Sequence, residues 1–220
     1  VPIEENFDAS DQMPLCWDSA GFNTYNIEIS NQEYSSAPAS VKLSHEAYSF
    51  AMLIAPEVKA TQSDVRVSFR AMQPNPSAIG MLTVGIITDP TDISTFSAVE
   101  EFELTHKPES PWHHLTVYLN GYTDSNLHIA FKLGDENGDN QSLIFLDDIA
   151  IEMPPACPEP YNIYTDSITQ TTADVFWSDF GQATSWSIEW GETGFELGTG
   201  TQVANLNEPY HRITGLSHSK

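Results

Sequence analysis

Asp147 and Asp148 are adjacent carboxylates within an apolar segment. Of all residues in this sequence, they most need a chemical explanation. Residues 145–149 read Phe-Leu-Asp-Asp-Ile, which otherwise predicts a buried strand. A buried carboxylate is costly unless a cation or strong hydrogen bonds compensate its charge. A hard cation such as Ca²⁺ takes roughly six to eight oxygen ligands, and carboxylates supply them well. The alternative is that one aspartate faces solvent while the other caps a bulge.

A second acidic cluster, Asp-Glu-Asn-Gly-Asp-Asn at residues 135–140, superficially resembles the calcium loop of an EF-hand. It lacks the bidentate glutamate that ends such a loop, and no helices are predicted to flank it. Asn137-Gly138 is a strong hairpin turn signal. We therefore predict a hairpin at this position and no metal site.

Aromatic side chains in or beside predicted loops are candidates for carbohydrate binding. Sugar recognition uses exposed ring faces for C–H stacking, with polar groups nearby to bond the hydroxyls. The alternative for each tyrosine is an ordinary half-buried strand residue. The candidates are Trp17, Tyr25, Tyr34, Tyr48 and Tyr122.

Catalytic chemistry has little support in the sequence. His113 and His114 are adjacent, so on a strand they point to opposite faces and cannot share one zinc ion. No HExxH or Cys–His metal spacing is present. Glu101 and Glu103 share a strand face, but glycoside hydrolysis needs carboxylates that flank a cleft. Without a nucleophile elbow, phosphate loop or serine triad, we predict no catalytic residues and no enzyme.

Two cysteines, Cys16 and Cys157, are too few for a disulfide framework and lack a zinc-binding spacing. They either form one bridge, which would close a long loop and stabilise the fold by a few kcal/mol, or remain two buried thiols. The sequence favours neither alternative.

The elements that must position these residues are strands. Residues 41–44, 65–70 and 127–132 alternate apolar and polar side chains, as half-buried strands do. Residues 81–88 and 142–146 are apolar on both faces, which predicts inner strands. Clusters of Gly, Pro, Asn and Asp separate them, and no convincing helix is found. Many short strands with such turns predict a β-sandwich.

The charge balance excludes several functions. Eight Lys plus Arg against 31 Asp plus Glu give a net charge of −23, which excludes general nucleic-acid binding and disfavours anionic membranes. No apolar run approaches the roughly 18 residues of a membrane helix, so no membrane insertion is expected. The N-terminus lacks the basic and apolar regions of a signal peptide, although we expect an exported protein.

A change in composition divides the chain after residue 153. Residues 154–160 read Pro-Pro-Ala-Cys-Pro-Glu-Pro, which predicts a stiff extended linker. Further short strands, separated by glycine-containing turns, are expected beyond it. We therefore predict a domain at residues 1–153, a proline-rich linker at 154–160 and a second domain at 161–220.

The second domain carries a family likeness in four segments: Cys-Pro-Glu-Pro at 157–160, residues 171–177, Trp-Ser-Ile-Glu-Trp at 186–190, and residues 210–216. In this order they resemble the start of a fibronectin type III domain. The resemblance implies that Trp177 and alternate residues of the 186–190 strand face a core. Such domains continue with two further strands, so the resemblance implies a partial module.

Four segments of the first domain carry a second likeness, in their order and spacing: residues 6–17, 39–56, 82–96 and 112–151. They resemble the cleaved-adhesin domain of secreted and surface proteins from Bacteroidetes-type bacteria, a jelly roll related to MAM domains. The resemblance implies a non-catalytic module that binds carbohydrate or host proteins, often with bound calcium. The first and last strands of a jelly roll lie side by side, so Asp8 could meet Asp147. By analogy, Asp147 is the first choice as a calcium ligand and Asp148 the second.

We therefore expect an all-β protein, a jelly-roll β-sandwich followed by a partial fibronectin type III-like β-sandwich. Its expected role is adhesion or carbohydrate binding within a larger secreted or cell-surface bacterial protein, with calcium as a structural cofactor. The expected partners are a glycan or a host surface or matrix protein, and further domains of the same longer chain. The alternatives are a structural spacer that presents another domain and, third, a glycan-active enzyme.

Overall fold

The computed structural model describes residues 3–58, 65–108, 110–119, 127–154, 160–179 and 183–216. Within these ranges the chain consists of antiparallel strands and one short 3₁₀ turn, η1 (Ile93–Thr95). It forms two compact units, unit 1 (Val1–Met153) and unit 2 (Pro154–Lys220). Within the described ranges no helix has the length and apolarity needed to cross a membrane.

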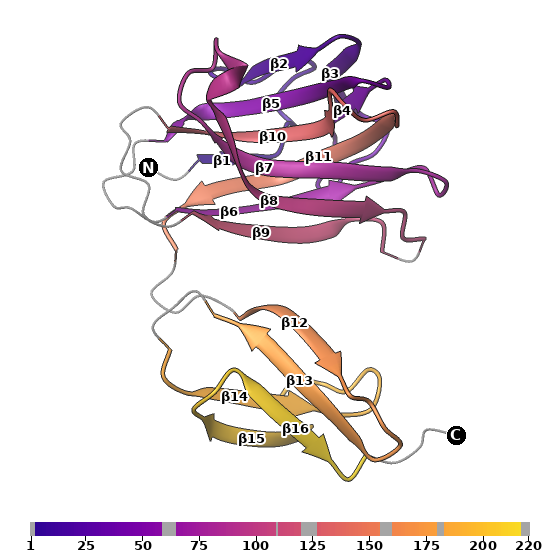
Figure 1. Cartoon of the computed structure of the whole chain (residues 1–220), viewed down its shortest axis with the longest axis vertical. Coiled ribbons are helices and arrows are strands. Elements are labelled where there is room, and N and C mark those ends of the chain that lie inside the picture. Colours follow the sequence, from indigo (N-terminus) through magenta and orange to yellow (C-terminus); the bar gives the residue numbers. More distant parts are fainter. Residues whose placement is uncertain are drawn as a thin grey trace. The chain divides into compact units, whose positions relative to one another are not determined.

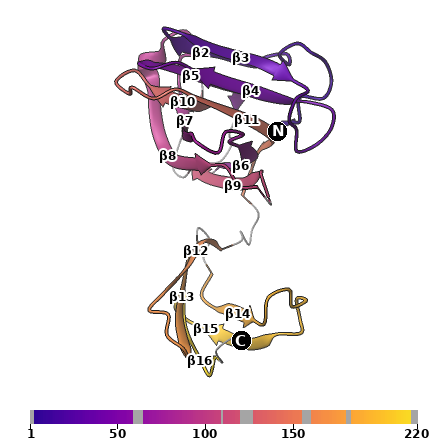
Figure 2. The same cartoon turned by 90° about the vertical axis from the view of Figure 1, so that its right-hand side faces the viewer.

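Unit 1 is a sandwich of two antiparallel sheets (Figures 1 and 2). The six-stranded sheet contains β1 (Ile3–Glu5), β3 (Tyr25–Ser30), β4 (Ser40–His45), β6 (Val65–Met72), β9 (His113–Leu119) and β11 (Ser142–Glu152). Its order is β3-β4-β11-β6-β9, and β1 also pairs with β11. The five-stranded sheet contains β2 (Asp18–Phe22), β5 (Ser49–Val58), β7 (Ile79–Ile87), β8 (Phe96–Thr105) and β10 (Leu127–Asp135). Its order is β2-β5-β10-β7-β8, and the predicted all-β, jelly-roll architecture is confirmed.

Alternating side chains explain how these strands bury one core. In β6, Val65, Val67 and Phe69 are at most 4% exposed, whereas the polar residues between them are half-buried. Phe69 packs edge-to-face against Phe131 of the opposite sheet, with ring centroids 5.2 Å apart. Burial of each such side chain stabilises the fold by about 1.5–3 kcal/mol, so the inward positions hold the two sheets together.

The outward face of the five-stranded sheet is also apolar. In β5, alternate residues face the core, and Phe50, Met52 and Ile54 instead form a second cluster with Ile87 and Ala130. An antiparallel sandwich usually presents polar side chains outward. The outer side of this sheet therefore differs from an ordinary solvated surface.

Strand β11 joins the two ends of unit 1. Ile3 pairs with Ile151 and Glu5 pairs with Ile149, so the first and last strands lie side by side. A bulge interrupts the pairing of β11 with β6 between Asp147 and Ala150, and Asp148 has a φ of 49° there. Asp147 is completely buried and Asp148 is half-buried, so the bulge separates the environments of the two carboxylates.

Residues 135–140 form a turn, but the predicted hairpin is wrong. The N–H of Gly138 donates to the carbonyl of Asp135 at 3.1 Å, and that of Asn137 donates to Asp135 Oδ1 at 2.6 Å. Strands β10 and β11 belong to different sheets, so this turn carries the chain from one sheet to the other. The Asn-Gly pair predicted a chain reversal correctly, but the pairing partners depend on residues far away in the sequence.

Unit 2 contains two small sheets. Its three-stranded sheet has the order β12 (Tyr161–Asp166), β13 (Thr172–Ser178), β16 (Tyr210–Thr214), and β14 (Trp186–Trp190) pairs with β15 (Thr201–Leu206). A core of Val175, Trp177 and Ile213 lies between them, so Trp177 is buried, as the resemblance to a fibronectin type III domain implies.

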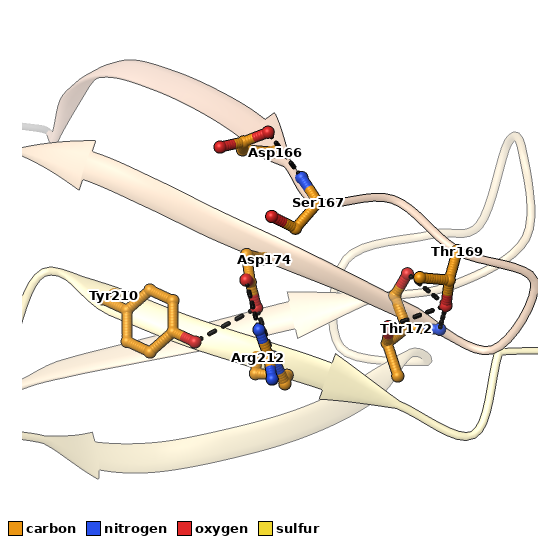
Figure 3. A network of polar contacts seen from close by, with 7 residues as sticks. All are labelled: Asp166, Ser167, Thr169, Thr172, Asp174, Tyr210 and Arg212. Carbon is orange, nitrogen blue, oxygen red and sulfur yellow. Dashed lines mark hydrogen bonds and ion pairs between the residues drawn. The ribbon is translucent and has the colours of Figure 1, made fainter.

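A polar network ties β13 to β16 on the three-stranded sheet of unit 2 (Figure 3). Asp174 accepts hydrogen bonds from Arg212 Nε and Nη2, both at 2.6 Å, and from the Tyr210 hydroxyl at 3.1 Å. The Arg212 guanidinium holds the pKa of Asp174 below its usual range. Because all three donors converge on one carboxylate, this network fixes the pairing of the two strands.

Candidate functional site

A groove of about 430 Å³ lies on the outer face of the five-stranded sheet. Phe22 of β2 is 44% exposed and stacks on Phe50 of β5, with ring centroids 6.3 Å apart and planes 16° apart. Because Phe50 is only 4% exposed, Phe22 supplies the aromatic surface of this pair that a ligand can reach. The lining residues are Phe22, Phe50, Met52, Ile93, Ser94, Phe96, Lys132 and Glu136.

The opposite wall of the groove is the connection between β7 and β8, which reaches across the sheet towards β2 (Figures 1 and 2). Asp89 Oδ1 accepts hydrogen bonds from the Thr91 N–H and hydroxyl, and Asp92 Oδ1 accepts from the Ser94 N–H and hydroxyl. The Thr95 hydroxyl donates to the Asp92 carbonyl at 2.8 Å. These local bonds order the loop before any ligand arrives.

Glycine at position 85 allows Phe96 to lie flat against the sheet. A methyl group at Gly85 would lie 2.7 Å from the Phe96 ring and 2.3 Å from the Ser97 carbonyl oxygen. Any larger side chain would therefore displace the wall of the groove.

One cation lies inside the groove. Lys132 Nζ is 4.4 Å above the centre of the Phe50 ring and 3.2 Å from Glu136 Oε2. The Lys132 side chain is only 16% exposed. Its aliphatic part therefore belongs to the apolar floor, and its ammonium bridges the ring and the carboxylate.

Two of the predicted metal ligands, Asp8 and Asp147, accept hydrogen bonds from the loop between β3 and β4. Asp147 Oδ2 accepts hydrogen bonds from the N–H groups of Ser35 and Ser36, at 2.7 and 2.9 Å. Asp8 Oδ1 accepts from the N–H of Ala39 at 2.9 Å. The two carboxylates therefore contact the same segment, residues 35–39, and their sharing of one ion stays a prediction.

Burial raises the pKa of the Asp147 carboxyl to about 6, although backbone N–H groups of Ser36, Ser35 and Asp148 lower it in part. Next to it, Ser36 Oγ is buried without a hydrogen-bond partner. Desolvation that is only partly compensated and an unpaired oxygen are features that a bound cation would satisfy.

The same region does not form a dense carboxylate cluster. Across the described part of the chain, no three His, Cys, Asp or Glu side chains gather closely enough to hold a metal on their own. Asp148 Oδ2 lies 3.6 Å from Arg70 Nε, so this second-choice ligand is paired with a cation of the chain. Any metal here would rely on Asp8, Asp147 and oxygens of the loop.

The predicted aromatic ligand-binding residues are not gathered in one site. Trp17 is 8% exposed and packs edge-to-face on Phe7, so the structure contradicts its assignment to sugar stacking. Tyr34 is 45% exposed in the β3–β4 connection. Tyr122 lies outside the described residues.

Tyr25 and Tyr48, by contrast, share one end of unit 1. They are 39% and 55% exposed, and Asn23 Nδ2, beside Tyr25, donates to the Tyr48 carbonyl at 2.8 Å. The N–H of Tyr48 donates to the carbonyl of Gly138, in the turn that follows Glu136. Tyr48 therefore contacts the turn that contributes Glu136 to the groove, but it is not among the residues that line the groove.

Residues considered for catalysis have structural contacts. His113 Nε2 lies 3.0 Å from the Thr105 carbonyl. Glu101 and Glu103 are exposed on β8, and Glu101 accepts a long hydrogen bond, 3.4 Å, from the buried Thr83. Cys16 is exposed, whereas Cys157 lies outside the described residues, so their pairing stays a prediction.

Sequence reasoning missed the phenylalanines of the groove. Phe22, Phe50 and Phe96 come from three different strands, and none was assigned to a predicted loop. One signal was present: Phe-Ala-Met-Leu-Ile-Ala, residues 50–55 of β5, is apolar on both faces of the strand. A strand with two apolar faces can be a central strand of a core or the floor of a groove, and one sequence does not separate these cases.

Several solved structures resemble unit 1 in size and architecture. The K1 cleaved adhesin domain of Lys-gingipain from Porphyromonas gingivalis W83 is 17% identical, with a TM-score of 0.52, covering 70% of this chain and 99% of that one. The K3 cleaved adhesin domain of the same protein is 18% identical with a TM-score of 0.51, and the match covers 68% of this chain and 95% of that one. The CBM22-1 xylan-binding domain of Paenibacillus barcinonensis Xyn10C is 12% identical with a TM-score of 0.50, and the match covers 69% of this chain and 92% of that one. The likeness at these identities is one of fold.

No family model and no curated protein matches this sequence.

Proposed function

We propose that this chain is a non-catalytic glycan-binding or adhesion module, and that unit 1 binds its ligand in the groove of the five-stranded sheet. The observation that carries the proposal is the open aromatic face of Phe22 stacked on Phe50, next to the Lys132–Glu136 pair. Ring faces and adjacent hydroxyl-bonding groups are the combination that sugars require. The xylan-binding domain and the cleaved adhesin domains that share the fold support the same class of function.

The test is a glycan array with the full chain, followed by calorimetry on the best ligand. Replacement of Phe22 by Ala should weaken binding by about tenfold or more, equivalent to 1.4 kcal/mol. Tyr34→Ala, which removes an equally exposed ring on the β3–β4 loop, is the matched control and should bind normally. Full binding by Phe22→Ala would exclude the groove as the site.

The alternative is a structural spacer that recognises nothing. An absence of binding to glycans, matrix proteins and host surface proteins by the wild-type chain would favour it. The groove argues against this alternative, because a spacer has no need of an exposed aromatic ring, Phe22, that faces a preordered loop across a groove.

We also propose that Ca²⁺ stabilises unit 1 at residues 35–39. The carboxylates of Asp8 and Asp147 would hold the ion, and its role would be to fix the chain ends and the loop rather than to do chemistry. The raised pKa of Asp147 and the unpaired Ser36 hydroxyl support this proposal. A chelator should lower the melting temperature, and added calcium should restore it.

Variants make the calcium test specific. Asp147→Asn should abolish the calcium-dependent shift, because it removes the buried ligand charge. Asp139→Asn, in the turn that resembles an EF-hand loop, should keep the shift. A melting temperature that chelator leaves unchanged in the wild type would refute the site.

Finally, we propose that the module acts outside the cell, as part of a secreted or surface-attached protein. Support comes from the fold that unit 1 shares with cleaved adhesin domains. We include in this proposal that unit 2 is a fibronectin type III-like module of the same protein. Accessibility of an epitope on intact cells of the source organism would test it.

A further inference from the structure

The sheet that carries the groove is predominantly acidic. The five strands of its sheet contain one Lys or Arg, Lys132, against six acidic residues. These acids are Asp18, Glu57, Glu100, Glu101, Glu103 and Asp135. Glu136 adds a further negative charge to the lining of the groove itself. An anion that approached this face would therefore meet an excess of negative charge.

The single cation is already engaged. Lys132 Nζ contacts Glu136 Oε2 at 3.2 Å and lies 4.4 Å from the Phe50 ring centre. An ammonium group has three N–H donors, so these two contacts leave one for a ligand. A sugar hydroxyl can accept a hydrogen bond from that N–H and donate one of its own to a Glu136 oxygen. A carboxylate or sulfate of a ligand would have to displace Glu136 first.

We propose that the groove selects uncharged glycans, and that Glu136 is the residue that excludes glycans bearing carboxylate or sulfate groups. The inference rests on the proposed glycan-binding function of the groove. Discrimination comes from a repulsive element as well as from contacts to the correct ligand. Glu136 supplies the exclusion, because it neutralises Lys132 and its carboxylate lies beside the ammonium that a ligand anion would have to approach.

The test is a glycan array with neutral glycans and glycans containing uronic acids, sialic acids or sulfate, probed with the full chain and its variants. Wild-type protein should bind neutral glycans only. Glu136→Gln should gain binding to acidic glycans by about tenfold or more, equivalent to 1.4 kcal/mol. The gained binding should weaken with added salt, because it depends on the unpaired Lys132 charge.

The chain offers a closely matched control. Glu28 forms the same kind of pair with Lys42 at 2.8 Å on the six-stranded sheet, outside the groove, with similar exposure of both side chains. Glu28→Gln changes the net charge identically and should leave the specificity unchanged. Glu136→Gln combined with Lys132→Gln should lose the gained acidic binding.

Each outcome separates the two proposals. Wild-type binding to acidic glycans that Phe22→Ala abolishes would overturn the selectivity and keep the groove. Equal gains by Glu136→Gln and Glu28→Gln would overturn the role of Glu136, because net charge alone would explain them. Binding of neutral glycans that Phe22→Ala leaves intact would overturn the groove itself, and with it this inference.

Discussion

Burial decides the behaviour of Asp147 at the residue scale. Its carboxylate is fully buried, accepts three backbone hydrogen bonds and still has a pKa raised to about 6. The sequence offered two ways to compensate this charge, a cation or strong hydrogen bonds. The hydrogen bonds are present, and the raised pKa indicates that they offset the desolvation only in part.

This residue makes the stability of unit 1 depend on pH. A carboxyl with a folded pKa above its unfolded value binds a proton on folding, so stability increases as pH falls from 7 to 5. Urea denaturation in the presence of chelator should reveal a gain on the order of 1–2 kcal/mol, since one pKa unit corresponds to about 1.4 kcal/mol.

Asp147→Asn should flatten this dependence. The interval from pH 7 to 5 lies above the pH range in which carboxyls with a lowered pKa, such as Asp174, lose their contribution to stability. With calcium bound, the sign should reverse, because protons then compete with the ion for Asp147. Equal pH profiles for wild type and variant in chelator would contradict the account.

Trp17 gives a second prediction at this scale. Because it is 8% exposed and packs on Phe7 in the core, Trp17→Ala should lower the free energy of unfolding by about 3–5 kcal/mol. Ligand affinity of the remaining folded protein should stay at the wild-type value. A selective loss of affinity without a loss of stability would restore Trp17 as a binding residue.

At the scale of elements, the pairing of β7 with β8 determines the shape of the groove. Gly85 pairs with Ala98, and a bulge next to this pair lets the start of β8 carry Phe96 over the sheet. Gly85→Ala should therefore cost about 1–3 kcal/mol of stability and also weaken ligand binding, because the Phe96 wall must move.

Gly138→Ala is the control for this prediction. A methyl group there would lie 3.0 Å from the flexible Asn140 side chain and at ordinary contact distances, 3.5 and 3.8 Å, from Asp135. Both variants can be compared by urea denaturation and by calorimetry with the same ligand. Unchanged affinity in Gly85→Ala would argue that Phe96 is not part of the binding wall.

The sequence predicts the strands better than the site, and the physical reason is the range of the interactions. Alternation along β6 and β10 is local, so their inward residues could be assigned correctly. The strands that pair with β11 are decided by contacts far along the chain. The Asn-Gly turn does not reveal these contacts, so its prediction of a hairpin is wrong. The groove has the same origin, because Phe22, Phe50 and Phe96 meet only after three strands have paired.

At the scale of the whole molecule, two separate hydrophobic cores predict independent folding. The main core of unit 1 lies entirely before Met153, and the core of unit 2 consists of residues from β13 onwards. Residues 1–153 alone should therefore fold, melt cooperatively and bind the same ligand as the full chain. Calorimetry on both forms would check this, and loss of binding in the shorter one would assign a role to unit 2.

The pairing of β1 with β11 has a mechanical consequence. Ile3 lies opposite Ile151, so the two chain ends of unit 1 leave the same side of one short antiparallel ladder. Tension applied through these ends opens the ladder one pair at a time, like a zipper, instead of shearing all its hydrogen bonds together. Under tension, β1 should thus detach at low force, and Asp8, three residues beyond it, would be the next contact to load. An ion held by Asp8 and Asp147 would then act as a mechanical clasp.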